Sequence, residues 1–249
     1  FIVMREDTSL YGLPMSSLHY NTNNYTYYSE IPAVLKDVND SSFNPIVDVF
    51  NNDYGGWVAL RENGTIAVWG HHNHGGFSGE STSEYFSGAP SSLTNVNDPS
   101  FNPIGNIFFT QAAFAALRSN GTIAVWGSHN SGGFSGESTS EDFSGAPSSL
   151  TDITDPSFVP VVNIFSSQYT FVALKEDGTI QVWGRTISEG SYEDRQWIWP
   201  STKLTDITHS SFAPVVNIIP FNNNSADAFL ALNSNGEVVP FGRSYVRNN

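Results

Sequence analysis

Residues 62–70 read Glu-Asn-Gly-Thr-Ile-Ala-Val-Trp-Gly, and most of this phrase returns along the chain. It recurs twice almost unchanged and once in altered form, at residues 121–127, 178–184 and 236–242. Its aromatic residue returns at intervals of 57, 57 and 58 residues, at Trp69, Trp126, Trp183 and Phe241. A constant period of this length is typical of repeat architectures, so we expect a chain assembled from copies of one unit.

The repeated phrase predicts the second half of a β-hairpin. A short apolar run such as Trp57-Val-Ala-Leu60 precedes each turn, and β-branched and aromatic residues follow it. Asn-Gly or Asp-Gly at the turn is a strong hairpin signal, because a type I′ turn needs positive φ at both central residues. We predict that the structural core of the repeats comprises Asn63, Gly64, Trp69, Gly70, Asn120, Gly121, Trp126, Gly127, Asp177, Gly178, Trp183, Gly184, Gly236 and Phe241.

An opening phrase precedes each hairpin, with a Phe-x-Pro motif followed by an Ile/Val run. Its proline recurs at residues 45, 103, 160 and 214. Proline lacks a backbone N–H, so we expect it just before a strand. After each Trp-Gly comes a polar closing loop, and loops 71–93 and 128–150 differ at only three positions.

These boundaries define one repeat domain, 1–249. Its units are a partial N-terminal copy at 1–34, repeats at 35–92, 93–149 and 150–203, and an incomplete C-terminal repeat at 204–249. In the partial copy, Phe1-Ile-Val-Met-Arg-Glu-Asp7 aligns with residues 171–177, and Thr8 stands where the turn glycine is expected.

The Ala-Leu…Gly…Trp-Gly pattern resembles the regulator-of-chromosome-condensation repeat family, and it is most similar to divergent copies in large bacterial surface proteins. The resemblance covers nearly the whole chain and implies four-stranded blades around an axis. We therefore expect an all-β fold, a β-propeller-like array of about four and a half four-stranded blades. The closing loops lack the family's Gln-Leu-Gly phrase, and the family commonly has seven blades.

Composition limits the classes of partner. Lys and Arg number 10 against 24 Asp and Glu, giving a formal net charge of −14. Nucleic-acid binding needs basic surface, so we expect no nucleic-acid partner. No apolar run approaches the roughly 20 residues of a membrane span, so we expect no membrane insertion. The chain has no cysteine, and only 14% of its residues are charged. This polar, cysteine-free composition favours an extracellular or cell-surface protein, and bacterial proteins fit it best.

Two groups of polar residues are candidate metal ligands. His71, His72 and His74 cluster, but the duplicate loop keeps only His129, so we favour a solvated turn over a metal site. Acidic or turn-forming residues recur in the opening phrases and are weak candidates for Ca²⁺, at Asp37/Asp40, Asn95/Asp98, Asp152/Asp155 and Asp206/His209. Asp and Asn also favour turns by bonding their own backbone, and we favour that interpretation. We predict no cofactor.

The closing loops hold the remaining candidates. Their carboxylates, Glu80, Glu84, Glu137, Glu141 and Asp142, occur in two nearly identical loops, whereas a catalytic pair is normally unique, so we predict no enzyme. Aromatic and amide side chains there could bind a sugar or a protein, or could fold back onto the blade. These candidate binding residues are Asn73, Phe77, Phe86, Asn130, Phe134, Phe143, Trp197 and Trp199.

We predict a non-enzymatic extracellular structural or adhesive protein that acts by surface contacts. Incomplete terminal blades expose unpaired strand edges, which favours self-assembly head to tail or into a filament. The partner is then another copy, or alternatively another surface protein or a glycan. Two alternatives remain open: a monomeric propeller module that binds a protein partner, as exchange factors and inhibitors do, and a carbohydrate-binding lectin.

Overall fold

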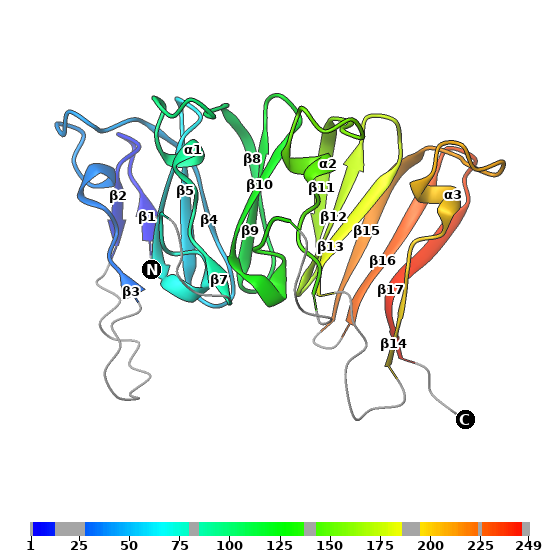
Figure 1. The fold of residues 1–249 in the computed structure, drawn as a ribbon. Helices are drawn as coiled ribbons and strands as arrows, with labels where there is room; N and C mark the ends of the chain where they lie inside the picture. Colours follow the sequence, from blue (N-terminus) through cyan, green and yellow to red (C-terminus); the bar gives the residue numbers. More distant parts are fainter. Residues whose placement is uncertain are drawn as a thin grey trace.

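The computed structural model describes residues 2–12, 28–79, 85–136, 143–185, 195–223 and 226–245 of the 249-residue chain. Its strands form five antiparallel sheets that stand side by side in a row, running from the N-terminal to the C-terminal end (Figure 1). The described helices span three or four residues each, and none is long and apolar enough to cross a bilayer.

Four of the sheets contain the three strands that the repeat predicts. The first strand follows the proline of the opening phrase, the second leads into the turn, and the third carries the Trp-Gly pair. In each sheet the register shifts near the start of the first strand. The strands are β4 (Ile46–Asn51), β5 (Gly56–Arg61), β6 (Ile66–His71), β8 (Ile104–Phe109), β9 (Ala113–Arg118), β10 (Ile123–Ser128), β11 (Val161–Ser166), β12 (Thr170–Lys175), β13 (Ile180–Gly184), β15 (Val215–Asn223), β16 (Ala226–Asn233) and β17 (Val238–Tyr245).

A fourth, edge strand pairs with the third strand and comes from the segment before the opening phrase. β7 (Phe86–Ser87), near the end of one repeat's closing loop, pairs with β10 of the next repeat. β3 (Tyr28–Ser29) and β14 (Arg195–Ile198) have the same place, and in the third sheet a single bridge from Ser144 to Gly184 occupies it. Each predicted repeat boundary, at 35, 93, 150 and 204, falls between the edge strand and the first strand of a sheet.

The fifth sheet is the N-terminal hairpin, formed by β1 (Ile2–Met4) and β2 (Leu10–Gly12). It corresponds to the second and third strands of a complete sheet. Ser9 donates hydrogen bonds from its backbone N and its Oγ to Asp7 Oδ1, at 2.9 and 2.6 Å. Thr65 bonds Asn63 Oδ1 in the same way, so the partial copy folds with the turn chemistry of the others.

Short helical turns, which no helical periodicity predicts, precede the first strands. They are η2 (Ala33–Leu35), α1 (Ser91–Thr94), α2 (Ser148–Thr151) and α3 (Thr202–Thr205). Each supplies one leucine with no exposed surface, at Leu35, Leu93, Leu150 and Leu204. Two further turns, η3 (His72–His74) and η4 (His129–Ser131), begin the closing loops.

The hydrophobic core is divided into clusters, one between each pair of consecutive sheets. We call each contact between consecutive sheets a junction, and we call the two faces of a sheet upstream, toward the N-terminal end, and downstream. The upstream faces carry stacked aromatic pairs, such as Phe114–Trp126 at 5.3 Å between ring centroids. Trp69, Trp126, Trp183 and Phe241 are all at most 2% exposed.

The fold is therefore the predicted all-β, propeller-like array, with four blades and a two-stranded partial blade. The blade architecture that the family resemblance implies is present in the strand pairing itself. In the part of the chain that the structure describes, no hydrophobic cluster joins the N-terminal hairpin to the C-terminal sheet, and these lie at opposite ends of the row (Figure 1).

Candidate interaction site at the C-terminal sheet

The turn glycine of each complete repeat packs against the proline of the next repeat. A Cβ built on Gly64 or Gly121 would lie 2.6 Å from the Cβ of Pro103 or Pro160, and one on Gly178 would lie 2.4 Å from that of Pro214. All three glycines have φ near +78°, so both conformation and space require glycine here.

A backbone hydrogen bond completes each of these contacts. The residue after the proline donates its N–H to the turn glycine's carbonyl, at 3.0 Å for Ile104, 2.9 Å for Val161 and 2.8 Å for Val215. The same turn contact is therefore made at three successive junctions, which identifies it as part of the repeat's joining mechanism.

The next sheet also covers the downstream face. Its residues alternate along the strands with those of the upstream face, as the pleat requires. At the start of the third strand, Ile66, Ile123 and Ile180 are at most 1% exposed. On the second strand Val58, Ala115 and Val172 have no exposed surface, and the phenylalanines of the first strand, Phe50, Phe108 and Phe165, pack against the next sheet's cluster.

The C-terminal sheet carries apolar residues at the same positions, but the described residues leave them uncovered. Val238, the counterpart of Ile66, is 54% exposed, and Ile219, the counterpart of Phe50, is 50% exposed. Leu230 is half-buried where its counterparts are fully buried, and Pro240 is exposed. We call this surface the C-terminal face and define it by Ile219, Leu230, Val238 and Pro240.

The last turn is also open. Gly236 has φ of +81°, like its counterparts, yet a Cβ built on it would meet no heavy atom of the described residues within 4 Å. The three repeated strands of this sheet, β15, β16 and β17, have eight or nine residues, against five or six in the other complete sheets. Phe221, two residues beyond Ile219 on β15, therefore extends the same apolar face and is 45% exposed.

The predicted binding residues of the closing loops lie in a different environment. Phe77 and Phe134 are half-buried, because each packs over a glycine: a Cβ on Gly88 or Gly145 would lie 2.5 or 2.6 Å from the ring. The backbone fixes both loops, since Ala89 N and Ala146 N donate to the carbonyls of Phe77 and Phe134, each at 2.8 Å. The phenylalanines thus fold back onto the blade.

The other loop candidates are scattered. Phe86 lies in β7, Phe143 packs edge-on against Phe134, Asn73 is half-buried, and Asn130 is exposed. Trp199 is 57% exposed beside the C-terminal sheet's edge strand, whereas the side chain of Trp197 lies outside the described residues. A groove of about 540 Å³ runs between Phe86, His129 and Phe134. Five carboxylates also lie outside the described residues: Glu80, Glu84, Glu137, Glu141 and Asp142.

The candidate metal ligands form no metal cluster among the described residues. His71 and His74 instead stack with 4.1 Å between ring centroids, and His74 Nδ1 lies 3.2 Å from the carbonyl oxygen of Tyr54, which accepts its hydrogen bond. Burial, followed by repulsion from His74 and His72, lowers the pKa of His71 to about 4. Burial also lowers the pKa of His74, against the opposing effect of the Tyr54 carbonyl.

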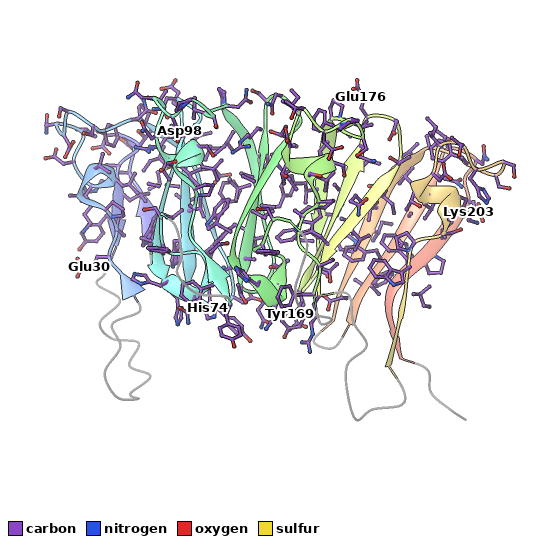
Figure 2. The ribbon with its side chains drawn as sticks, in the orientation of Figure 1. Glu30, His74, Asp98, Tyr169, Glu176 and Lys203 are labelled. Atoms are coloured by element: carbon purple, nitrogen blue, oxygen red, sulfur yellow. The ribbon has the colours of Figure 1, made fainter. Side chains whose placement is uncertain are left out.

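The recurring acidic residues bond their own turns. Asp98 Oδ1 accepts from Ser100 N at 2.8 Å and its Oδ2 from Ser91 Oγ at 2.6 Å, and Asp155 repeats both bonds with Ser157 and Ser148. The hydrogen bond from the Ser91 hydroxyl is the main cause of the lowered pKa of Asp98, and that from the Ser148 hydroxyl is the main cause for Asp155. Figure 2 shows Asp98 and Glu176 along one edge of the row, opposite His74 and Tyr169.

Sequence reasoning placed self-association at the terminal blades, through unpaired strand edges of incomplete blades. The C-terminal sheet instead has all four strands, and the apolar C-terminal face was not identified as the contact surface. Its residues look like those of the other repeats, and their exposure depends only on their place at the end of the row. The fourth copy of the repeated phrase does differ from the others, with Pro240 in place of valine, but no local pattern in it identifies the face.

No family model and no curated protein matches the chain. Among solved structures, it is similar to yeast RCC1 (Prp20) bound by Kap60, with 16% identity, a TM-score of 0.49, and coverage of 82% of this chain and 44% of that one. It is also similar to human WBSCR16, with 13% identity, a TM-score of 0.49, and coverage of 84% and 50%.

A third similar structure is the CRINKLY WD40 ectodomain of the Arabidopsis thaliana receptor kinase ACR4. It has 13% identity and a TM-score of 0.43, and the match covers 82% of this chain and 54% of that one. The chain thus spans about half the length of these structures. At these identities and TM-scores, the fold assignment rests on the strand pairing described above, and no function is carried over.

Proposed function

We propose that this protein is a non-enzymatic, cofactor-independent repeat scaffold outside the cell, on a bacterial surface, that acts by protein contacts and self-associates through its terminal sheets. The single observation that supports self-association most strongly is the exposure of the C-terminal face. Val238 is 54% exposed where its counterparts are buried, and Ile219 is 50% exposed.

The physical reason is the cost of leaving such a surface in water. Fully burying a Val, Leu or Ile side chain stabilises a contact by about 1.5–3 kcal/mol, and contiguous apolar patches mark interaction sites. Three copies of the same surface are already covered by another sheet of the same kind. A second copy of the chain carries such sheets, so it is a partner of matching chemistry.

The test is the association state of the purified full chain over a range of concentrations, measured by sedimentation velocity and electron microscopy. Wild type is expected to form larger species as its concentration rises. Ile219→Asp should prevent this, because association would then bury an unpaired charge.

Val216→Asp is the matched control. Val216 lies in the same strand and is 55% exposed, but its counterparts Val47 and Val162 remain 57% and 52% exposed in sheets whose downstream faces are covered. The position therefore lies outside the junction, and association should persist. A wild-type chain that stays monomeric up to high concentration, with Ile219→Asp indistinguishable from it, would refute self-association.

The same variants address the alternative of a monomeric partner-binding module. A monomer that captures another surface protein, and loses it with Ile219→Asp but not with Val216→Asp, would replace self-association with that function. The half-buried packing of Phe77 and Phe134 gives no support to a lectin site at those rings.

A further inference from the structure

The N-terminal junction departs from the other three at its turn. Thr8 occupies the position of the turn glycine with φ of 63°, the only positive φ of a non-glycine residue in the described chain. Ile46 follows Pro45 as Ile104 follows Pro103, yet no hydrogen bond from Ile46 N to the Thr8 carbonyl occurs among the described residues. The first opening phrase therefore lacks the backbone hydrogen bond that joins the other three opening phrases to the preceding turn.

The upstream face of the first complete sheet also lacks a hydrogen bond that its counterparts make. Trp126 Nε1 and Trp183 Nε1 donate to the carbonyls of Gly75 and Gly132 in the preceding closing loops, at 3.1 and 3.2 Å. Trp57 Nε1 and Trp69 Nε1 are buried with no partner among the described residues, and Trp69 is 1% exposed. An unsatisfied buried donor costs about 1–3 kcal/mol, so the two indoles weaken this junction.

The covering element itself is small. The N-terminal hairpin supplies two strands where every other junction has a sheet with at least three, and its buried contribution comes mainly from Leu10, with Ile2 packed beside it. Met4 and Tyr11 are 47% and 54% exposed. Two strands alone are marginally stable in water, so the hairpin depends on this weak junction for its structure.

The two ends of the row are complementary. The C-terminal sheet offers a turn glycine, Gly236, and a downstream face that no described sheet covers. The first complete sheet offers a Phe-x-Pro phrase, Phe43-Asn44-Pro45, beneath a two-stranded hairpin.

We propose that the C-terminal sheet of one copy docks on the upstream face of the first complete sheet of another copy and displaces the N-terminal hairpin. This inference rests on the proposed self-association. Gly236 then receives Pro45 as Gly64 receives Pro103, and the repeat array continues from copy to copy. The hairpin acts as a cap that keeps the free chain from associating. Such a contact is heterologous, so it extends into a filament unless its rotation closes a ring.

The experiment measures the concentration of half-assembly of full-length variants by sedimentation velocity. Thr8→Gly relieves the backbone strain and strengthens the cap, so half-assembly should move to several-fold higher concentration. Leu10→Ala weakens the cap and should move it several-fold lower. Met4→Ala, at an exposed position of the same hairpin, is the control and should change nothing.

Two further measurements exclude nonspecific aggregation. The double variant Leu10→Ala/Ile219→Asp should remain monomeric, because the gained association still requires the C-terminal face. Hydrogen exchange should show that the amides of residues 2–12, including Arg5 N and Thr8 N, lose protection in the assembled state.

The outcomes separate this inference from the proposed function. If Ile219→Asp abolishes assembly while Thr8→Gly and Leu10→Ala leave the half-assembly concentration unchanged, or if the hairpin amides stay protected, the displaced cap is wrong and self-association stands. If the double variant still assembles, docking through the C-terminal face is wrong.

Discussion

At the scale of single residues, the turn glycines combine a conformational and a steric requirement. Gly64, Gly121 and Gly178 need positive φ, and each also lies against a proline of the next repeat. Gly236 shares the conformation but has no such neighbour among the described residues. Comparing Gly121 with Gly236 therefore separates the conformational requirement from the steric one.

Gly121→Ala should destabilise the fold more than Gly236→Ala. Both variants force a Cβ into a left-handed conformation, at a cost of about 1 kcal/mol. Only the first also places a Cβ 2.6 Å from Pro160, where overpacking adds about 1–3 kcal/mol. Urea unfolding of the two variants measures the difference, and equal losses would show that the proline contact contributes nothing.

The stacked histidines predict a pH dependence of stability. The pKa of His71 is lowered to about 4 from the ordinary 6.5, so the unfolded chain takes up the proton first as pH falls. Stability is therefore full above pH 6.5 and declines as pH falls toward 4. Because the ring is half-exposed and solvent screens it, we expect a loss of about 1 kcal/mol.

His71→Ser should reduce this decline and leave the share that His74 contributes, since burial also lowers the pKa of His74; Ser128 occupies the position in the next repeat. Urea unfolding at pH 7 and pH 5 checks it, because carboxyls with lowered pKa values, such as those of Asp98 and Asp155, stay ionised in that interval. A variant as sensitive to pH as the wild type would contradict the assignment to His71.

At the scale of elements, the closing loop links two sheets by two means. It provides the edge strand of the next sheet, and its glycine carbonyl accepts the next sheet's indole N–H. The junction therefore depends on the closing loop as well as on the long strands.

Trp126→Phe should cost more stability than Trp69→Phe. Both indoles are at most 1% exposed, so each substitution removes similar packing. Only Trp126 loses a hydrogen bond, to Gly75, and that loss leaves a carbonyl without its donor, at about 1 kcal/mol. Thermal or urea unfolding measures the two losses, and the prediction fails if Trp69→Phe is as damaging.

The sequence predicted the three repeated strands, the turns and the burial of the tryptophans, because alternation and Asn/Asp-Gly turns are local signals. It did not locate the edge strands: β3 and β7 have two residues each, which is too short for any periodicity. The helical turns were missed for the same reason. The terminal blades were predicted to self-associate, but the apolar C-terminal face was not identified, because Val238 and Ile219 differ from their buried counterparts only in that no described sheet covers them.

At the scale of the whole molecule, the charge opposes the contact that the apolar ends favour. The formal net charge is −14, and the described residues contain two ion pairs, Lys36–Glu30 and Lys203–Glu237. Two copies that approach each other therefore repel at long range, whereas the proposed contact is apolar. Ionic strength should tune the balance between the two.

Added salt should favour assembly. The screening length falls from about 30 Å at 0.01 M salt to about 10 Å at 0.1 M, so repulsion between acidic copies weakens while apolar burial is retained. Sedimentation velocity at the two salt concentrations, with Ile219→Asp as a non-assembling reference, measures the shift. Assembly that dissolves on adding salt would indicate ion pairing in place of apolar contact.

The row of sheets also determines how the molecule responds to pulling. Among the described residues each hydrophobic cluster joins only neighbouring sheets, and the N-terminal hairpin and the C-terminal sheet lie at opposite ends of the row (Figure 1). A stretching force applied between the termini is therefore transmitted through the junctions in series. The N-terminal hairpin, which has only two strands, should detach first under this load. It would then extend before the sheets that bury tryptophans separate.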